Sequence, residues 1–362
     1  MPEARGTVIH SARLVDGGAV HADAWVRFER EHVAAVGTGD SWRSAGHQHS
    51  DDTIVDASGH WLTPGFVDIH GHGGGGVSYD DGAEQILTAR ALHRAHGTTR
   101  AVISLVTAPL DALATRVALI AELCAAHPDI LGSHLEGPFL DPGHKGAHDA
   151  SQLRAPDEAA VALLIEAASG TLCQVTIAPE LPGGMAAVAQ LRAAGVVPAI
   201  GHTDADFGGA QAAIDAGAGL LTHAFNAMRG LHHRDPGPVA AASHDPRLVL
   251  EIIADGVHVH PEVVRMVFAA APARVALVTD AMAAAGASDG HYDLGSLGVD
   301  VVDGVARLSD GGAIAGSTLT QDAALRWCVE TVGIDVASAV TALTETPARA
   351  VGRGDDPGRL VP

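Results

Sequence analysis

The pattern of apolar and polar residues changes at about residue 60. Before that point, short β-rich runs alternate with turns that contain Gly and Asp, which is typical of a small antiparallel sheet. These runs cover residues 7–9, 24–28, 32–36 and 53–55. From Trp61 onwards, apolar strand-like runs alternate with helical segments rich in Ala and Leu. The chain therefore divides into a small β-rich part and a larger part of alternating strands and helices.

The larger part contains eight apolar runs, each followed by a crossover. Parallel strands that are buried on both faces need such continuous apolar runs. Eight strand–helix units also match a (β/α)₈ barrel of roughly 250 residues. We therefore predict an α/β fold with a TIM barrel over residues 61–351, and a doubly wound open sheet is the alternative. The runs are PGFVDIH, TRAVISLV, ILGSHLEG, QVTIAPE, VVPAIGHT, AGLLTHAFN, RLVLEIIADG and RVALVTDAM.

The segments between these runs predict the remaining elements. An insertion at residues 286–312 resembles a hairpin carried on the last barrel loop. We expect residues 1–60, together with 352–362, to form a small β-sandwich-like domain. Helices are predicted over residues 82–96, 110–126, 157–168, 185–194, 208–216, 261–270, 320–332 and 336–351.

Composition narrows the class of protein. The chain has 362 residues, of which 47% are hydrophobic and 18% charged, so it can bury a large core and is not intrinsically disordered. A net charge of −21 argues against nucleic acid or an anionic membrane as a partner. No apolar run approaches the roughly 18 residues of a membrane span, and the N-terminus lacks a signal-peptide pattern. Three dispersed cysteines make no disulfide framework, so we expect a cytoplasmic protein.

The barrel runs share a chemical feature, because almost all of them finish in His, Asp or Glu. Catalytic groups of barrel enzymes lie at these carboxyl ends. Buried imidazoles and carboxylates are costly unless they are paired or bound to a metal. We therefore predict a divalent metal site, with zinc favoured by the mixture of ligands and iron or manganese also compatible. The strand-end residues are His70, His72, Glu136, Glu180, His202, His223, Asp255 and Asp280, and the predicted ligands are His70, His72, Glu136, His202, His223 and Asp280.

Each of these residues also has a purely structural explanation. His70 and His72 could be two turn histidines, although i and i+2 in a strand point to one side and can reach one ion. Glu136 could form an ion pair at the rim, and Asp280 could cap the next helix. The glycine run at residues 73–76 lacks the ending of a P-loop, so we interpret it as a sharp turn beside the metal.

Longer motifs resemble one enzyme family. PGFVDIHGHGG, HLEGPFL, KGAHD, GHTDA, THAFNAM, HHRDPG, ADGVHV, VTDAM and IAGSTLT stand in the order found in N-acetylglucosamine-6-phosphate deacetylases of the amidohydrolase superfamily. The similarity begins at about residue 5 and covers nearly the whole chain. THAFNAM, HHRDPG and DGVHV together are specific to this branch of the superfamily.

The resemblance implies a role for each matching residue. Glu136, His202 and His223 would form the main metal site, and Asp280 would be the catalytic acid and base. Some relatives carry amides at the first motif, but this chain keeps His70 and His72, which favours a second ion with Glu136 as the bridge. The implied substrate contacts are His148 to the acetamide, Asn226 and Ala227 to the phosphate through their backbone, Arg234 and His258 to its charge, and Ile314, Ala315 and Gly316 over the sugar.

The resemblance also implies an activity and an assembly. The expected reaction is the metal-dependent hydrolysis of N-acetylglucosamine 6-phosphate to glucosamine 6-phosphate and acetate in amino-sugar catabolism, by a metal-activated water with Asp280 as base and acid. Family members are homodimers, in which Arg234 or His258 would reach the neighbouring pocket. The alternatives are N-acetylgalactosamine 6-phosphate or a cyclic amide as substrate, or a non-catalytic protein that binds metal and sugar phosphate. The resemblance also implies closing strands after residue 351 that complete the N-terminal sheet, and the residues there, GRGDDPGRLVP, do not show a strand pattern.

Overall fold

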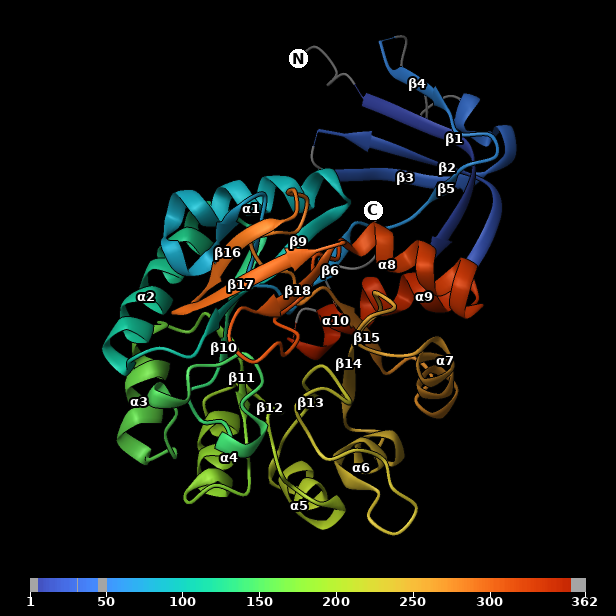
Figure 1. The fold of residues 1–362 in the computed structure, drawn as a ribbon. Coiled ribbons are helices and arrows are strands. Elements are labelled where there is room, and N and C mark those ends of the chain that lie inside the picture. The colour runs from blue at the N-terminus through green and yellow to red at the C-terminus, as the bar shows by residue number, and fades with distance from the viewer. Residues whose placement is uncertain (1–5, 31, 45–50, 353–362) are drawn as a thin grey trace.

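A parallel eight-stranded sheet forms the centre of the molecule. The computed structural model describes residues 6–30, 32–44 and 51–352. Neighbouring strands follow the order β15-β14-β13-β12-β11-β10-β9-β6, with every pair parallel, and helices surround the sheet (Figure 1). The predicted TIM barrel is confirmed. Its strands are β6 (Phe66–Asp68), β9 (Thr98–Val106), β10 (Ile130–Glu136), β11 (Leu172–Ile177), β12 (Val197–Ile200), β13 (Leu220–Leu221), β14 (Val249–Ile253) and β15 (Val275–Val278).

The first and last strands of the barrel are joined just beyond their carboxyl ends. The backbone N–H of Asp280 donates to the carbonyl of His70 at 2.8 Å, and the N–H of His72 donates to the carbonyl of Ala281 at 2.7 Å. The buried side-chain amide of Gln321 also links these two strands, because it donates to the carbonyls of Val67 in β6 and Leu277 in β15. Closure of the barrel therefore brings the HxH motif directly against Asp280.

The outer helices agree closely with the sequence prediction, with two exceptions. The helix over Gly237–His244 was not predicted. The segment 336–351 forms two helices because the backbone leaves the helical conformation at Thr344. Pro347 lacks the N–H that a continuous helix would need, but it is accommodated in the first turn of the second helix. The helices are α1 (Ala83–Ala95), α2 (Leu110–Ala126), α3 (Glu158–Ala167), α4 (Gly184–Ala193), α5 (Phe207–Ala216), α6 (Gly237–His244), α7 (Pro261–Ala270), α8 (Gln321–Trp327), α9 (Val336–Leu343) and α10 (Glu345–Ala350).

A separate five-stranded sheet near the N-terminus lies outside the barrel, beside α9 (Figure 1). The prediction of a purely antiparallel sheet was wrong, because β4 and β5 both pair with β1 in the parallel sense. The predicted contribution of residues 353–362 to this sheet lies outside the described residues, and the boundary at residue 60 stays a prediction. Its strands are β1 (Gly6–Asp16), β2 (Ala19–Glu29), β3 (His32–Thr38), β4 (Thr53–Asp56) and β5 (Trp61–Leu62).

The predicted hairpin at 286–312 is larger than expected. It forms a three-stranded antiparallel sheet from β16 (Gly290–Leu294), β17 (Leu297–Val302) and β18 (Val305–Leu308). Its apolar side packs with Val106 at the end of β9 and with Met282 beyond β15. The sheet is thereby fixed beside the carboxyl ends of the barrel strands.

Among the described residues, no helix combines the length and the apolar character needed to cross a membrane.

Candidate metal centre and active site

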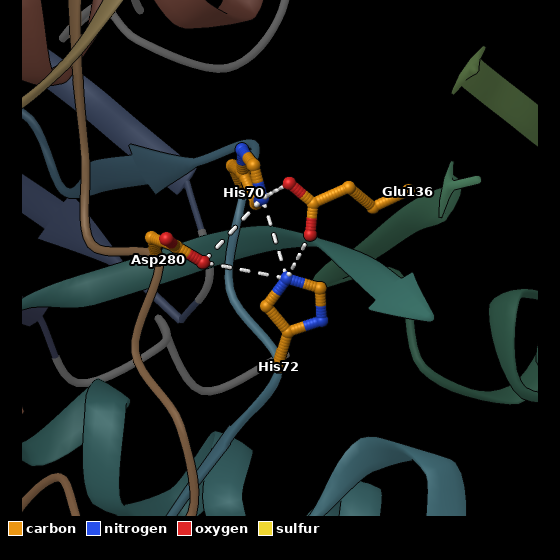
Figure 2. A group of neighbouring side chains, drawn as sticks. All are labelled: His70, His72, Glu136 and Asp280. Carbon is orange, nitrogen blue, oxygen red and sulfur yellow. Dashed lines mark hydrogen bonds and ion pairs between the residues drawn. The ribbon is translucent and has the colours of Figure 1, made fainter. Parts of the chain in front are cut away.

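Glu136, the last residue of β10, lies at the centre of a cluster of buried side chains. One side of the cluster is formed by His70, His72 and Asp280, as Figure 2 shows. The Nε2 atom of His72 lies 3.0 Å from Oε2 of Glu136 and 3.4 Å from Oδ1 of Asp280. The Nε2 atom of His70 lies 3.4 Å from Oε1 of Glu136 and 3.5 Å from the same oxygen of Asp280.

The other side of the cluster comes from two later strands. The Nε2 atoms of His202 and His223 lie 3.1 and 2.9 Å from Oε1 of Glu136, and 3.0 Å from each other. His148, from the loop after β10, places its Nε2 atom 3.5 Å from Oε2 of Glu136. The six predicted ligands are therefore brought together around one carboxylate, although they are up to 210 residues apart in the sequence (70 to 280).

The backbone at three of these positions is unusual. His202, His223 and Asp280 have φ values of 48°, 25° and 48°, in the left-handed region that non-glycine residues rarely adopt. Each residue follows a short buried strand, and the left-handed turn redirects the chain there. Such conformations cost on the order of 1–3 kcal/mol each and persist where the surrounding structure requires them. Their coincidence at three strand ends marks a functional site.

Hydrogen bonds on the outer side of the rings decide which nitrogen faces the cluster. The Nδ1 atom of His70 contacts the Glu251 carboxylate at 2.9 Å, and Nδ1 of His202 contacts the backbone carbonyl of His144 at 2.9 Å. Both partners accept hydrogen bonds, so each Nδ1 carries the proton and donates it. In the neutral rings Nε2 is then a free lone pair directed at Glu136, the form in which imidazole binds a metal.

The donor set therefore fits a divalent cation. The Nε2 atoms of His202 and His223 lie 3.0 Å from each other and 3.1 and 2.9 Å from Oε1 of Glu136, so a cation bound among them would be held by all three side chains. Four imidazoles and two carboxylates suit zinc and related metals. The two halves of the cluster share Glu136.

Burial and charge shift the pKa values in the cluster in opposite directions. Burial lowers the pKa of His72, but the carboxylates of Asp280 and Glu136 outweigh it and raise this pKa to about 9. The pKa of His70 is raised for the same reason, with Glu251 contributing. Burial raises the pKa of Glu136, but the neighbouring imidazoles outweigh it and hold the pKa well below its usual range. Burial lowers the pKa of His202 to about 4.

The cluster opens into a cavity of about 240 Å³. Within it, His258 is fixed by the Asp255 carboxylate, which accepts from its Nδ1 at 2.7 Å. The Thr107 hydroxyl donates to the backbone carbonyl of Glu136, so its oxygen accepts from Nδ1 of His148. The residues predicted from the sequence that line this cavity are His72, Glu136, His148, His202, His223, Asn226, Ala227, His258, Asp280, Ile314 and Gly316.

Four predicted residues lie elsewhere. Ala315 is buried behind its neighbours, and Glu180 accepts hydrogen bonds from Thr203 and Asp204 away from the cluster. Arg234 is exposed, does not line its own chain's cavity, and contacts the ring of His233 at 2.7 Å. Asp255 acts on His258 and not on the ligand cluster.

The glycine run at residues 73–76 behaves as predicted. Gly75 and Gly76 have φ values of 66° and 87°, and a Cβ on Gly73 would lie 2.4 Å from the carbonyl oxygen of Val77. Only glycine permits this sharp turn directly after His72. The run therefore has a structural role beside the cluster and makes no phosphate cradle.

Several residues of the site were missed by the sequence analysis. Thr107, Glu251 and Gln174 lie within or just after barrel strands and hold the ligands or each other through hydrogen bonds. Val106, Leu294, Gly146 and Ala147 add to the cavity wall. The one available signal was a charged residue inside an apolar strand, Glu251 in RLVLEIIADG.

Comparisons with known proteins agree with this geometry. A model of the amidohydrolase family matches residues 61–362. The chain is 40% identical over 314 residues to the N-acetylgalactosamine-6-phosphate deacetylase of Escherichia coli O157:H7, covering 86% of this chain and 83% of the relative. It is 38% identical over 300 residues to the N-acetylglucosamine-6-phosphate deacetylase of Vibrio furnissii, covering 80% and 74%. A solved structure of a variant N-acetyl-D-glucosamine-6-phosphate deacetylase from Mycobacterium smegmatis, in complex with N-acetyl-D-glucosamine-6-phosphate, has a TM-score of 0.90 at 41% identity, covering 96% and 91%.

The raised pKa of His72 predicts that metal binding releases protons. At pH 7 a ring with a pKa of about 9 carries a proton, which it must lose to become a ligand. Zinc affinity should therefore increase as the pH rises from 7 towards 9. Calorimetric titration of the metal-free protein with Zn²⁺ in two buffers of different ionisation enthalpy measures the released protons. An uptake or release of zero protons at pH 7 would contradict the assignment, and His72→Gln should release fewer protons than the unmodified chain.

Proposed function

The chain belongs to the amidohydrolase family, and on that premise we propose that it hydrolyses N-acetylglucosamine 6-phosphate to glucosamine 6-phosphate and acetate. One observation carries the proposal: a His/Glu/Asp cluster of metal-ligand type opens into a small cavity that also contains the buried imidazole of His258. The cavity thus offers a hydrolytic centre and a potential cation for a phosphate. The relatives at 38–40% identity are deacetylases of amino-sugar phosphates.

The proposed cofactor is zinc, with two ions held per chain. His202 and His223 would hold one ion, His70 and His72 the other, with Glu136 shared and Asp280 beside the second pair. A bound divalent ion supplies Lewis-acid chemistry, since it lowers the pKa of water towards roughly 7 and polarises a carbonyl. Iron and manganese are compatible with the same donors.

Asp280 is the proposed general base and acid. It lines the cavity, and its Oδ1 atom lies 3.4 Å from Nε2 of His72. Burial raises the pKa of Asp280, but His70 and His72 outweigh it and keep the pKa below its ordinary value, so the carboxylate is ready to accept a proton. After it takes the proton of the attacking water, it delivers that proton to the departing amine.

His148 is the proposed contact to the acetamide. Its Nδ1–H is held by Thr107, so its Nε2 atom faces the cavity and Glu136. When Nε2 is also protonated, the ring can donate a hydrogen bond to the carbonyl oxygen, where negative charge develops during attack. Thr107 therefore fixes the direction from which this donor approaches.

The phosphate end of the cavity needs positive charge, because the protein as a whole carries −21. The side chain of His258 is 7% exposed and is oriented by Asp255, and Asn226 and Ala227 lie on the adjacent loop. Ala227 has a φ of 49°, which turns the backbone sharply where the proposed phosphate contacts lie.

Arg234 is proposed to act across a homodimer. The residue is exposed and does not line the cavity of its own chain, whereas His258 does. A second copy of the chain would bring Arg234 to a neighbouring phosphate. The proposal of a cytoplasmic location is supported by the sequence, in which three dispersed cysteines do not make the framework typical of secreted proteins.

The direct test is acetate release from N-acetylglucosamine 6-phosphate by the zinc-loaded protein. We expect multiple turnovers, and loss of activity after chelation that Zn²⁺ restores. Binding of the sugar phosphate without any release of acetate would indicate a non-catalytic binding protein and contradict the proposal.

N-acetylgalactosamine 6-phosphate is the second candidate substrate, favoured by the 40% identical relative that is named as its deacetylase. The two sugars differ only at C4, so the ratio of their kcat/KM values decides between them.

Replacement of Asp280 tests the proposed base. Asp280→Asn should lower kcat by about 10²–10⁴-fold, because the amide cannot accept the proton of water. Elemental analysis of the same sample must show that zinc is still bound. Asp300→Asn, an exposed change on β17, is the control and should keep full activity. Near-normal turnover by a fully metallated Asp280→Asn protein would show that the role is assigned wrongly.

Replacement of Arg234 tests the phosphate contact. Arg234→Ala should raise KM for the phosphorylated sugar by about tenfold, equivalent to about 1.4 kcal/mol, since it removes a charge-assisted contact. The KM for unphosphorylated N-acetylglucosamine should stay unchanged. Mixing Arg234→Ala with a catalytically inactive Asp280→Asn chain adds a readout for action across the dimer: mixed dimers should regain activity with normal KM. Equal effects on both sugars would remove the phosphate assignment.

A further inference from the structure

Glu251 is a charged residue in the interior of the barrel. It lies in the middle of β14, within the apolar sequence VLEII, and is fully buried. A carboxylate without compensating partners at such a position costs several kcal/mol. It does not line the cavity and is too deep to contact a substrate there. Its presence therefore needs an explanation other than direct participation in the reaction.

Its contacts supply that explanation. The Oε2 atom of Glu251 contacts Nδ1 of His70 at 2.9 Å and accepts from the backbone N–H of His223 at 3.3 Å. The Oε1 atom accepts from the side-chain amide of Gln174 at 3.3 Å. That amide also donates to the carbonyl of Ile69 at 3.0 Å, which fixes its orientation.

All three groups that face Glu251 are donors. A carboxylate offers two acceptor oxygens, which together accept hydrogen bonds from all three donors. A glutamine at this position would offer one acceptor oxygen, and its NH₂ group would face either the His70 Nδ1–H or the amide of Gln174. The surroundings thus select a carboxylate specifically.

We infer that Glu251 is a positioning residue that sets both halves of the metal centre at once. It holds His70 with the proton on Nδ1 and Nε2 directed at Glu136, and it holds the backbone of His223 in its left-handed turn. His70 follows β6 and His223 follows β13, so one carboxylate on β14 joins ligands from the two halves of the cluster. The inference rests on the metal centre of the proposed function.

The other ligand rings are held differently. The Nδ1 atom of His202 is held by a backbone carbonyl, and the Nδ1 atoms of His72 and His223 have no hydrogen-bond partner. Among the described contacts to Nδ1 atoms of the cluster, only that of Glu251 comes from a carboxylate. A carboxylate that accepts from a ligating imidazole raises its basicity and fixes its orientation, and its loss typically weakens metal binding 10–100-fold.

The test measures metal binding directly. Metal-free protein is titrated with Zn²⁺ against a chromophoric chelator, and the ions per chain are counted after gel filtration. Glu251→Gln should bind Zn²⁺ 10–100-fold more weakly and retain fewer ions per chain. Glu251→Asp keeps the charge but is one methylene shorter, so it should give an intermediate loss and serves if the glutamine variant does not fold. Arg90→Met is the control: it removes an equally buried charge that donates to the carbonyl of Thr98, and it should lower the melting temperature without changing Zn²⁺ affinity.

A double-mutant cycle separates positioning from general destabilisation. In a His70→Ala background one of the two groups that Glu251 holds is gone and only its contact to the backbone of His223 remains, so Glu251→Gln should weaken Zn²⁺ binding by a smaller factor than it does when His70 is present. Unchanged Zn²⁺ affinity in Glu251→Gln, or an equal loss with and without His70, would overturn the inference. The acetate assay is independent: a chain whose Zn²⁺ affinity depends on Glu251 but that releases no acetate would contradict only the proposed function, and a chain that binds no zinc would overturn both.

Discussion

The structure depends on the close packing of several ionisable side chains around Glu136. Imidazole nitrogens from several strands approach this buried side chain within 3.5 Å, and the carboxylate of Asp280 lies 3.4 Å from Nε2 of His72. Water cannot solvate these groups there, so only a cation or a set of protons can make the arrangement stable. The pKa of His72 is raised and the pKa of Glu136 is lowered for this reason, because a positive charge on the imidazoles compensates the buried negative charge of the carboxylates. The left-handed backbone at three ligands is a further cost that the same charge must offset.

The barrel and the site are built by the same contacts. The first strand meets the last one at the HxH motif, through backbone hydrogen bonds between His70 and Asp280 and between His72 and Ala281. Asp68, buried beneath them, accepts from the hydroxyl of Thr279 and from the backbone of His70. Errors in closing the barrel would therefore displace ligands. This arrangement explains why polar residues are tolerated inside an otherwise apolar cylinder.

The cavity combines this centre with loops of different origin. The three-stranded sheet β16–β18 contributes Leu294, and the segment after it contributes Ile314 and Gly316. The loop after β14 contributes His258, oriented by Asp255. A strongly acidic protein thereby presents an apolar wall and an imidazole where a sugar phosphate is proposed to bind, while the acidic ligands remain neutralised within the cluster. The barrel fixes the reaction centre, and its loops adapt the cavity to a substrate.

The sequence by itself determined the barrel, most helix boundaries and the residues that cluster around Glu136. Long apolar runs that end in His, Asp or Glu, such as LTHAFN and LVTDAM, encode a buried strand and a polar mouth in the same few residues. Glu251 stands out in the sequence as a charged residue in an apolar strand, but its role and that of Gln174 could not be predicted, because nothing local tells which mid-strand residue faces the barrel axis or what lies across it. The break at Thr344 and the parallel pairing of β4 and β5 were likewise decided by packing between distant segments. Which nitrogen of His70 and His202 faces Glu136 was decided only by the tertiary structure, because the acceptors on the other side, Glu251 and the carbonyl of His144, come from remote parts of the chain.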